Sequence, residues 1–235
     1  PSIPAQGVCG SGVQSRLFLR IMGRGPGWNA HGFIQALATG ATNLSMLPAI
    51  VLAWRLGLYN EFVIGFMTMT TSGIYHTCES LEQEFLGYNE GRWHHMDNVF
   101  AILSFMTLSV QFAPHHRNAN VREFGNAASY SIAAVSQLMS PWNVMYTVVP
   151  ILMAVAYTLL SILLARRCVR TDGAAGRRSL IFLAVAVACF VKGLDERSDW
   201  LRLFHGGWHI SVGCFSYYTL LAAHPIESEK KMHTP

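Results

Sequence analysis

The sequence predicts an all-α integral membrane protein, a bundle of seven transmembrane helices. Composition is the first reason: 51% of the 235 residues are hydrophobic and only 13% are charged, whereas soluble domains usually carry about 25% charged residues. The second reason is that the apolar residues lie in long uncharged stretches, and a membrane-crossing helix needs about 20 of them. The net charge of +4 is modest and the arginines do not alternate with aromatic residues, so no nucleic-acid partner is expected.

The first half of the chain contains three such stretches, at residues 33–54, 62–78 and 96–113. Residues 124–165 then form a charge-free stretch that is long enough for two helices. Residues 140–143, Ser-Pro-Trp-Asn, divide it, because proline stops a helix and Ser or Asn can cap the next one. The fourth span, before this break, is the most polar of the set, and the fifth covers 144–165.

The last two predicted spans are residues 179–194 and 204–223. The resulting organisation is an N-terminal extramembrane segment, a seven-helix membrane domain and a C-terminal tail, at residues 1–32, 33–223 and 224–235. Strand-like alternation of apolar and polar residues is absent, so the bundle is expected to be entirely helical.

The distribution of basic residues predicts the orientation. Seven spans place the two ends of the chain on opposite sides, and ten Lys and Arg residues lie on the side of the C-terminus against seven on the other. Five of the ten flank one loop, at positions 166, 167, 170, 177 and 178. Because cytoplasmic loops are enriched in Lys and Arg, the C-terminus is expected inside and the N-terminus outside or lumenal, in a membrane that the sequence does not identify.

Polar side chains interrupt the spans at one side of the membrane. His76 ends the second span, Asp97 begins the third, and His205 and His209 lie at the start of the seventh. Polar groups at membrane depth are costly and indicate functional sites. Because successive helices alternate in direction, all four positions fall on the same side of the membrane. The count of basic residues predicts that this is the extracytoplasmic or lumenal side.

Helical spacing adds to this pattern. His205 and His209 are four residues apart and therefore share a helix face, as do Ser72 and His76. Three imidazoles with one open position are typical of a catalytic zinc site. The sequence thus predicts a metal site of His76, His205 and His209, with Asp97 and Ser72 beside it.

Each residue also has a simpler interpretation. A pair of histidines four apart can form interhelical hydrogen bonds, Asp97 can cap its own helix, and Ser72 can bond back to its own helix backbone. His94 and His95 neighbour Asp97 in the sequence and are expected at the membrane interface rather than among the ligands.

The ordered motifs resemble a known superfamily over roughly residues 33–223. The S-x-x-x-H motif ending at His76, the Asp at position 97 and the H-x-x-x-H motif from His205 look like the CREST membrane hydrolases. That group includes the alkaline ceramidases, the progestin and adipoQ receptors, and a branch with myomaker and a GPI-anchor-processing phospholipase A2. His-x-Cys at residues 76–78 and the acidic and aromatic run at 193–200 are similar to the myomaker-like branch.

Two departures from the relatives qualify the resemblance. No Asp or Glu precedes Glu61, so the acidic N-terminal calcium site of the alkaline ceramidases is missing. The C-terminus lacks the cysteine-rich tail of myomaker, so fusion activity is not implied.

The resemblance implies zinc as the cofactor, with His76, His205 and His209 as ligands. Asp97 would hold the water that attacks, and Ser72 would hydrogen-bond nearby. The expected function is zinc-dependent hydrolysis of an ester or amide bond in a membrane lipid.

Two other functions remain open from the sequence. One is a non-catalytic structural or assembly subunit that keeps the zinc site and binds other membrane proteins. The other is a receptor that signals without hydrolysis. A retinal protein is not favoured, because residues 204–223 contain no lysine.

Overall fold

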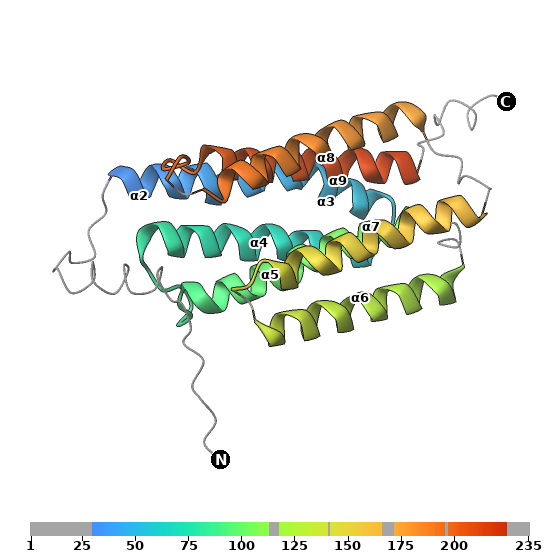
Figure 1. Ribbon diagram of the computed structural model, residues 1–235, viewed down its shortest axis with the longest axis horizontal. Coiled ribbons are helices and arrows are strands. Elements are labelled where there is room, and N and C mark those ends of the chain that lie inside the picture. The colour runs from blue at the N-terminus through green and yellow to red at the C-terminus, as the bar shows by residue number, and fades with distance from the viewer. Residues whose placement is uncertain (1–29, 113–117, 141, 166–171, 196, 225–235) are drawn as a thin grey trace, which may run out of the picture.

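The computed structural model describes residues 30–112, 118–140, 142–165, 172–195 and 197–224. Within these residues the regular structure is helical, apart from an isolated β-bridge between Phe85 and Tyr88. The helices run side by side along the long axis of the molecule (Figure 1). The prediction of an all-α chain is therefore confirmed for the described residues.

The first helical segment, Ala30–Arg55, changes its winding along its length. It consists of α2 (Ala30–Gln35), the π-helical turn η1 (Ala36–Gly40), the 3-10 turn η2 (Ala41–Met46) and α3 (Leu47–Arg55). The remaining helices are α4 (Tyr59–Leu81), α5 (Glu90–Phe112), α6 (Ala119–Met139), α7 (Met145–Ala165), α8 (Gly173–Gly193) and α9 (Leu203–Ala223). Their order follows that of the predicted spans.

Two of these segments are long and apolar enough to cross a membrane, Ala30–Arg55 and Gly173–Gly193. A shorter apolar helical stretch covers Met145–Tyr157. By length and composition, the chain therefore carries two candidate membrane-spanning helices among its described residues.

The helix ends differ from the predicted spans where polar caps extend them. The Asp172 side chain accepts hydrogen bonds from the backbone N–H groups of Ala174 (2.8 Å) and Ala175 (3.2 Å), so α8 begins several residues before the predicted start. The N–H groups of Ala175 and Ala174 also hold the pKa of this carboxyl below its usual value.

The helix α5 also begins before the predicted span, at Glu90. Asp97 therefore lies inside the helix, which rules out a capping role for it.

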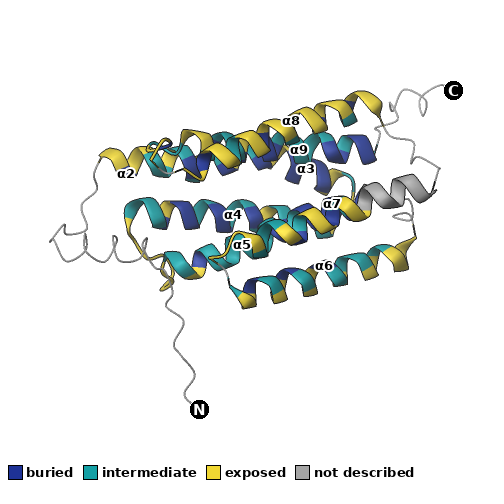
Figure 2. Ribbon diagram, viewed as in Figure 1, coloured by how far each residue is buried: buried dark blue, intermediate teal, exposed yellow. Residues whose placement is uncertain are grey.

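The core lies between α4, α5, α9 and the first segment. Figure 2 shows exposed residues along much of α8, whereas α4 and α9 carry many buried ones. The helix α9 packs on α8, α3 and η2, while α5 packs on α4, α6 and α7. This arrangement brings the end of α4 and the start of α9 to the same end of the bundle.

Two glycines let the backbone of α9 lie directly against the first segment. A Cβ atom at Gly206 would overlap the carbonyl oxygen of Ala38, and one at Gly213 would lie 2.5 Å from that of Ser45. The two glycines are two turns apart on one face of α9. Since the obstacles are backbone atoms, side-chain rotation cannot relieve the overlap.

We expect Gly206→Ala to lower the stability of the folded protein by about 1–3 kcal/mol, the usual cost of overpacking. Gly176→Ala in α8 is the matched control, because a Cβ there meets nothing within 4 Å. Thermal unfolding of the detergent-solubilised variants measures the difference. A Gly206→Ala variant that melts with the control would contradict the close approach.

Candidate metal centre

Three histidine side chains from two helices converge at one end of the bundle. His76 belongs to the last turns of α4, and His205 and His209 to the first turns of α9. One ring nitrogen of each lies within 4.8 Å of the others, so the group could hold a metal ion. The Nε2 atoms of His76 and His205 are 3.1 Å apart, and the residues His76 and His209 are both only 3% exposed.

The irregular first helix orients His209. The Thr39 carbonyl oxygen, in the π-helical turn, lies 2.9 Å from His209 Nδ1. A carbonyl oxygen only accepts, so this contact favours the tautomer in which Nδ1 carries and donates the proton, which leaves the Nε2 lone pair free to bind a metal. The Ser45 hydroxyl also donates to the His209 carbonyl oxygen at 3.0 Å.

A buried aspartate fixes the start of α9 and thereby His205. The Asp199 carboxylate accepts hydrogen bonds from the backbone N–H groups of Phe204 (3.1 Å) and His205 (3.0 Å). These donors would otherwise be unsatisfied at the helix N-terminus. Asp199 thus sets where the helix begins and in which direction His205 projects.

The chemistry of this group fits a metal ion. The buried Nδ1 atom of His76 has no hydrogen-bond partner, and the nearest carboxylate is Glu79, with Oε2 at 3.5 Å. The Nε2 atoms of His76 and His205 share a hydrogen bond when one of them is protonated. When neither is protonated, their lone pairs repel each other, and a shared cation removes that repulsion. Neutral imidazole is a common ligand of Zn, Cu, Fe and Ni ions, so the donor set alone leaves the metal open.

Asp97 and Ser72 lie beside the histidines on the wall of a cavity of about 570 Å³. The Ser72 side chain lies close to the Asp97 carboxyl group. All three histidines line the same cavity. The structure therefore brings together the five side chains that the sequence pattern singled out, while their chemical roles stay predictions.

The cavity extends from the histidines along the inside of the bundle. Its wall reaches Glu61 at the start of α4 and Leu220 near the end of α9. The distance from Glu61 to His76 corresponds to about 22 Å of helix at 1.5 Å per residue. Most of the lining residues between these ends are apolar, so the space suits a long apolar chain better than a polar solute.

Three residues that surround the histidines were not predicted from the sequence. Thr39 acts through its backbone, which no side-chain pattern reveals. Glu79 follows His76 by one helical turn, a spacing that could have identified it. Asp199 belonged to the acidic run noted before His205, but its capping role was not predicted.

His94 lies closer to this region than predicted. It lines the cavity, and its ring stacks on Trp142 with centroids 4.0 Å apart. It does not belong to the group that could hold a metal.

We expect the purified protein to bind about one divalent transition-metal ion per chain, because a single three-imidazole set is present among the described residues. His205→Ala and His209→Ala together should abolish this binding. His95→Ala, which removes a neighbouring imidazole outside the group, should retain it. Elemental analysis after metal loading and desalting gives the stoichiometry, and equal metal content in all three proteins would refute the site.

No match to the chain was found among curated proteins. Residues 31–210 match a family described as proteins of unknown function, DUF3522. This range includes all three histidines and ends just after His209, before the last residues of α9. That match covers most of the chain, and the chain therefore belongs to the DUF3522 family.

Proposed function

We propose that this chain is a zinc-dependent integral membrane hydrolase, which cleaves an ester or amide bond of a membrane lipid. One observation carries the proposal: three imidazoles, two of them buried, meet beside Ser72 and Asp97 at the end of a long and mainly apolar cavity. The resemblance of the ordered motifs to the CREST superfamily, and within it to the myomaker-like branch, points to the same chemistry.

The proposal includes seven membrane spans. Each helix from α4 to α9 has 21 to 23 residues, which is long enough to cross the hydrocarbon core. Large apolar side chains such as Phe66, Leu152 and Ile181 are exposed along the bundle, where lipid would cover them.

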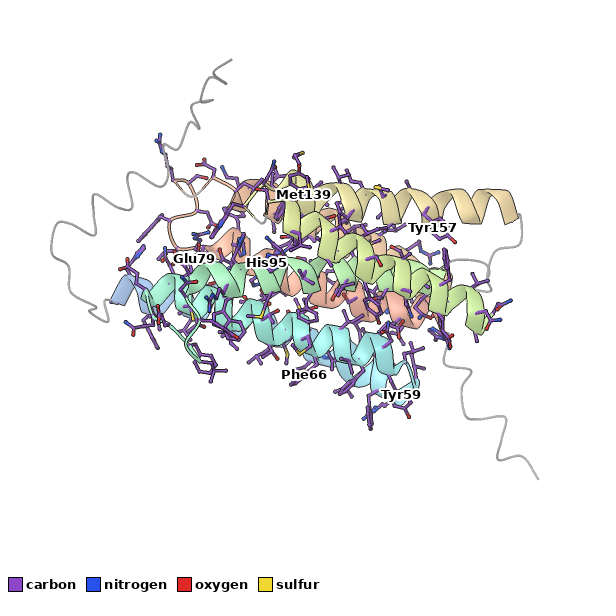
Figure 3. All side chains as sticks on the ribbon, turned by 90° about the horizontal axis from the view of Figure 1, so that it is seen from below. Tyr59, Phe66, Glu79, His95, Met139 and Tyr157 are labelled. Atoms are coloured by element: carbon purple, nitrogen blue, oxygen red, sulfur yellow. The ribbon has the colours of Figure 1, made fainter. Side chains whose placement is uncertain are left out.

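Exposed aromatic residues at both ends support the same placement. Trp142 and Trp200 belong to the histidine end, and Trp54 and Tyr59 to the other. Figure 3 shows Tyr59 at the end of the bundle opposite Glu79 and His95. Trp and Tyr are enriched at both membrane–water interfaces, so these residues favour a site near one face of the bilayer.

Zinc is the proposed metal, because three histidines with one open coordination position are the ligand set of catalytic zinc. Zinc acts there as a Lewis acid and makes water a usable nucleophile near neutral pH. Its binding requires neutral imidazoles, and the contact with the Thr39 carbonyl oxygen favours the required tautomer of His209.

Asp97 is the proposed base and Ser72 its partner. The Asp97 carboxylate accepts a proton from water as the water oxygen attacks the carbonyl carbon, then returns it to the departing alcohol or amine. The Ser72 hydroxyl lies close to this carboxylate, and in the proposed mechanism it donates a hydrogen bond that orients it. The apolar wall of the cavity keeps bulk water away and strengthens these electrostatic interactions.

The packing of the helices favours a lipid substrate. The described part of α8 packs mainly on α9, while α7 packs on α5 and α6. Side chains of α7 and α8, among them Ile151 and Leu183, both line the cavity. These helices thus face each other largely across the cavity, and the proposed entry for an acyl chain from the membrane lies between them.

A structural role is the second candidate, and one observation favours it. The histidines join α4 to α9, and Thr39 joins α9 to the first segment. A metal at this point would clamp these elements and stabilise the fold without turnover. The two candidates differ in what they require of Asp97, which is placed beside the histidines but outside the ligand group.

We expect Asp97→Asn to lower lipid hydrolysis by a factor of about 10²–10⁴, the usual contribution of a general base, while the zinc content is unchanged. Asp195→Asn is the matched control, since Asp195 is an exposed acid at the same end. The assay incubates each protein with a mixed lipid extract and compares the products by mass spectrometry. Full activity of Asp97→Asn would refute its role as base; wild-type protein with zinc but without any product would favour the structural role.

The proposed orientation places the loop after α4 outside the cytoplasm and the start of α8 inside it. Single cysteines at Glu84 and Ala174, both exposed, test this in a background without the five native cysteines. An impermeant thiol reagent on intact vesicles of known orientation should label only Glu84→Cys from the extracytoplasmic side. The reverse result would invert the orientation, and labelling of both positions from one side would refute the seven-span arrangement.

A further inference from the structure

A carboxylate lies directly behind one of the three histidines. Oε2 of Glu79 is 3.5 Å from Nδ1 of His76, one helical turn earlier on α4. Its other oxygen, Oε1, is 3.5 Å from Nη2 of Arg202 and accepts a hydrogen bond of 3.1 Å from the Tyr75 hydroxyl. Glu79 is largely buried and is seen at the end of the bundle in Figure 3.

The position of Glu79 matches a need of His76. When Nε2 of His76 faces a metal, the ring proton must reside on Nδ1, and this buried atom has no hydrogen-bond partner. A carboxylate that accepts this proton fixes the tautomer and the ring direction and makes the ligand more basic. The Thr39 carbonyl oxygen performs the corresponding task for His209.

Arg202 connects this carboxylate to the other ligand-bearing helix. It precedes α9 directly and has a φ of 58°, in the left-handed region. That conformation is unusual for a residue with a long side chain. Its guanidinium group nevertheless reaches back to Glu79, so one ion pair joins the end of α4 to the start of α9.

We propose that Glu79 is a positioning residue of the metal centre. It holds Nδ1 of His76 and, through Arg202, fixes the ligand-bearing ends of α4 and α9 relative to each other. The inference rests on the metal site of the proposed function, but it is independent of which bond is cleaved. Its consequence is that metal affinity and ligand geometry depend on a residue that is not itself a ligand.

Metal titration of three variants tests the role. Glu79→Ala should weaken Co²⁺ binding by about 10–100-fold, as loss of such outer partners usually does. Glu79→Gln should weaken it less, because its amide oxygen still accepts a hydrogen bond. Glu82→Gln removes a carboxylate from the exposed end of the same helix and should bind as the wild type does. Competition with a chelator of known affinity gives each dissociation constant.

Two further readouts separate positioning from general stability. The visible absorption of the Co²⁺-saturated protein reports ligand geometry, and it should change in Glu79→Ala but not in Glu82→Gln. The metal-free Glu79→Gln protein should melt close to the metal-free wild type. Arg202→Gly, which suits the positive φ but removes the guanidinium, should weaken Co²⁺ binding in the same direction as Glu79→Ala.

The outcomes distinguish this inference from the proposed function. Wild-type affinity in both Glu79 variants, with Co²⁺ bound by the wild type, would overturn the positioning role and leave the metal site intact. The inference would also be overturned if Glu79→Ala had the Co²⁺ spectrum of the wild type and a melting temperature lowered equally with and without metal. That result would favour a purely structural ion pair. Absence of Co²⁺ binding by the wild type would overturn both proposals.

Discussion

The contact between α9 and the irregular first helix sets the geometry of the histidine group. Gly206 and Gly213 allow the backbones to approach directly, and only at that distance does the Thr39 carbonyl oxygen reach His209 Nδ1. In a regular α-helix this oxygen would accept the N–H four residues later. The π-helical and 3-10 turns of η1 and η2 alter that pattern, as such irregular turns often do at functional sites. The cost of the irregular winding is offset by the hydrogen bonds that it makes available.

Both backbone and side-chain groups contact the three histidines and orient them. A carbonyl oxygen serves His209, the Asp199 cap fixes the backbone at His205, and a carboxylate lies behind His76. Each histidine is therefore contacted by a group from a different part of the chain. Buried polar groups are costly unless they are satisfied. The Thr39 carbonyl oxygen satisfies Nδ1 of His209, and the Glu79 carboxylate lies 3.5 Å from Nδ1 of His76. The ring nitrogen atoms that face one another could together hold a metal ion.

The sequence predicted the helices and the clustering of the site residues well, for a physical reason. Helix direction alternates along a bundle and side chains repeat every three to four residues, so His76, Asp97, His205 and His209 were expected at one end. The helix ends were less predictable, because the Asp172 cap and the internal position of Asp97 depend on local hydrogen bonds. Thr39 was beyond prediction, since its contribution is a backbone atom in a turn whose winding follows from tertiary contact. Glu79 could have been found from its spacing to His76, whereas its link to Arg202 required the fold.

The two ends of the cavity differ in how their polar groups are satisfied, and this difference favours one direction for a bound ligand. At the far end, the Gln111 amide donates to Glu61 at 2.5 Å, and its carbonyl oxygen lies 3.2 Å from the His224 ring nitrogen. These side chains bind one another, and Gln111 is completely buried. At the near end, the histidines and Asp97 face the cavity itself. A molecule with one polar linkage and one apolar chain therefore gains most when its linkage lies at the histidines and its chain extends toward Glu61.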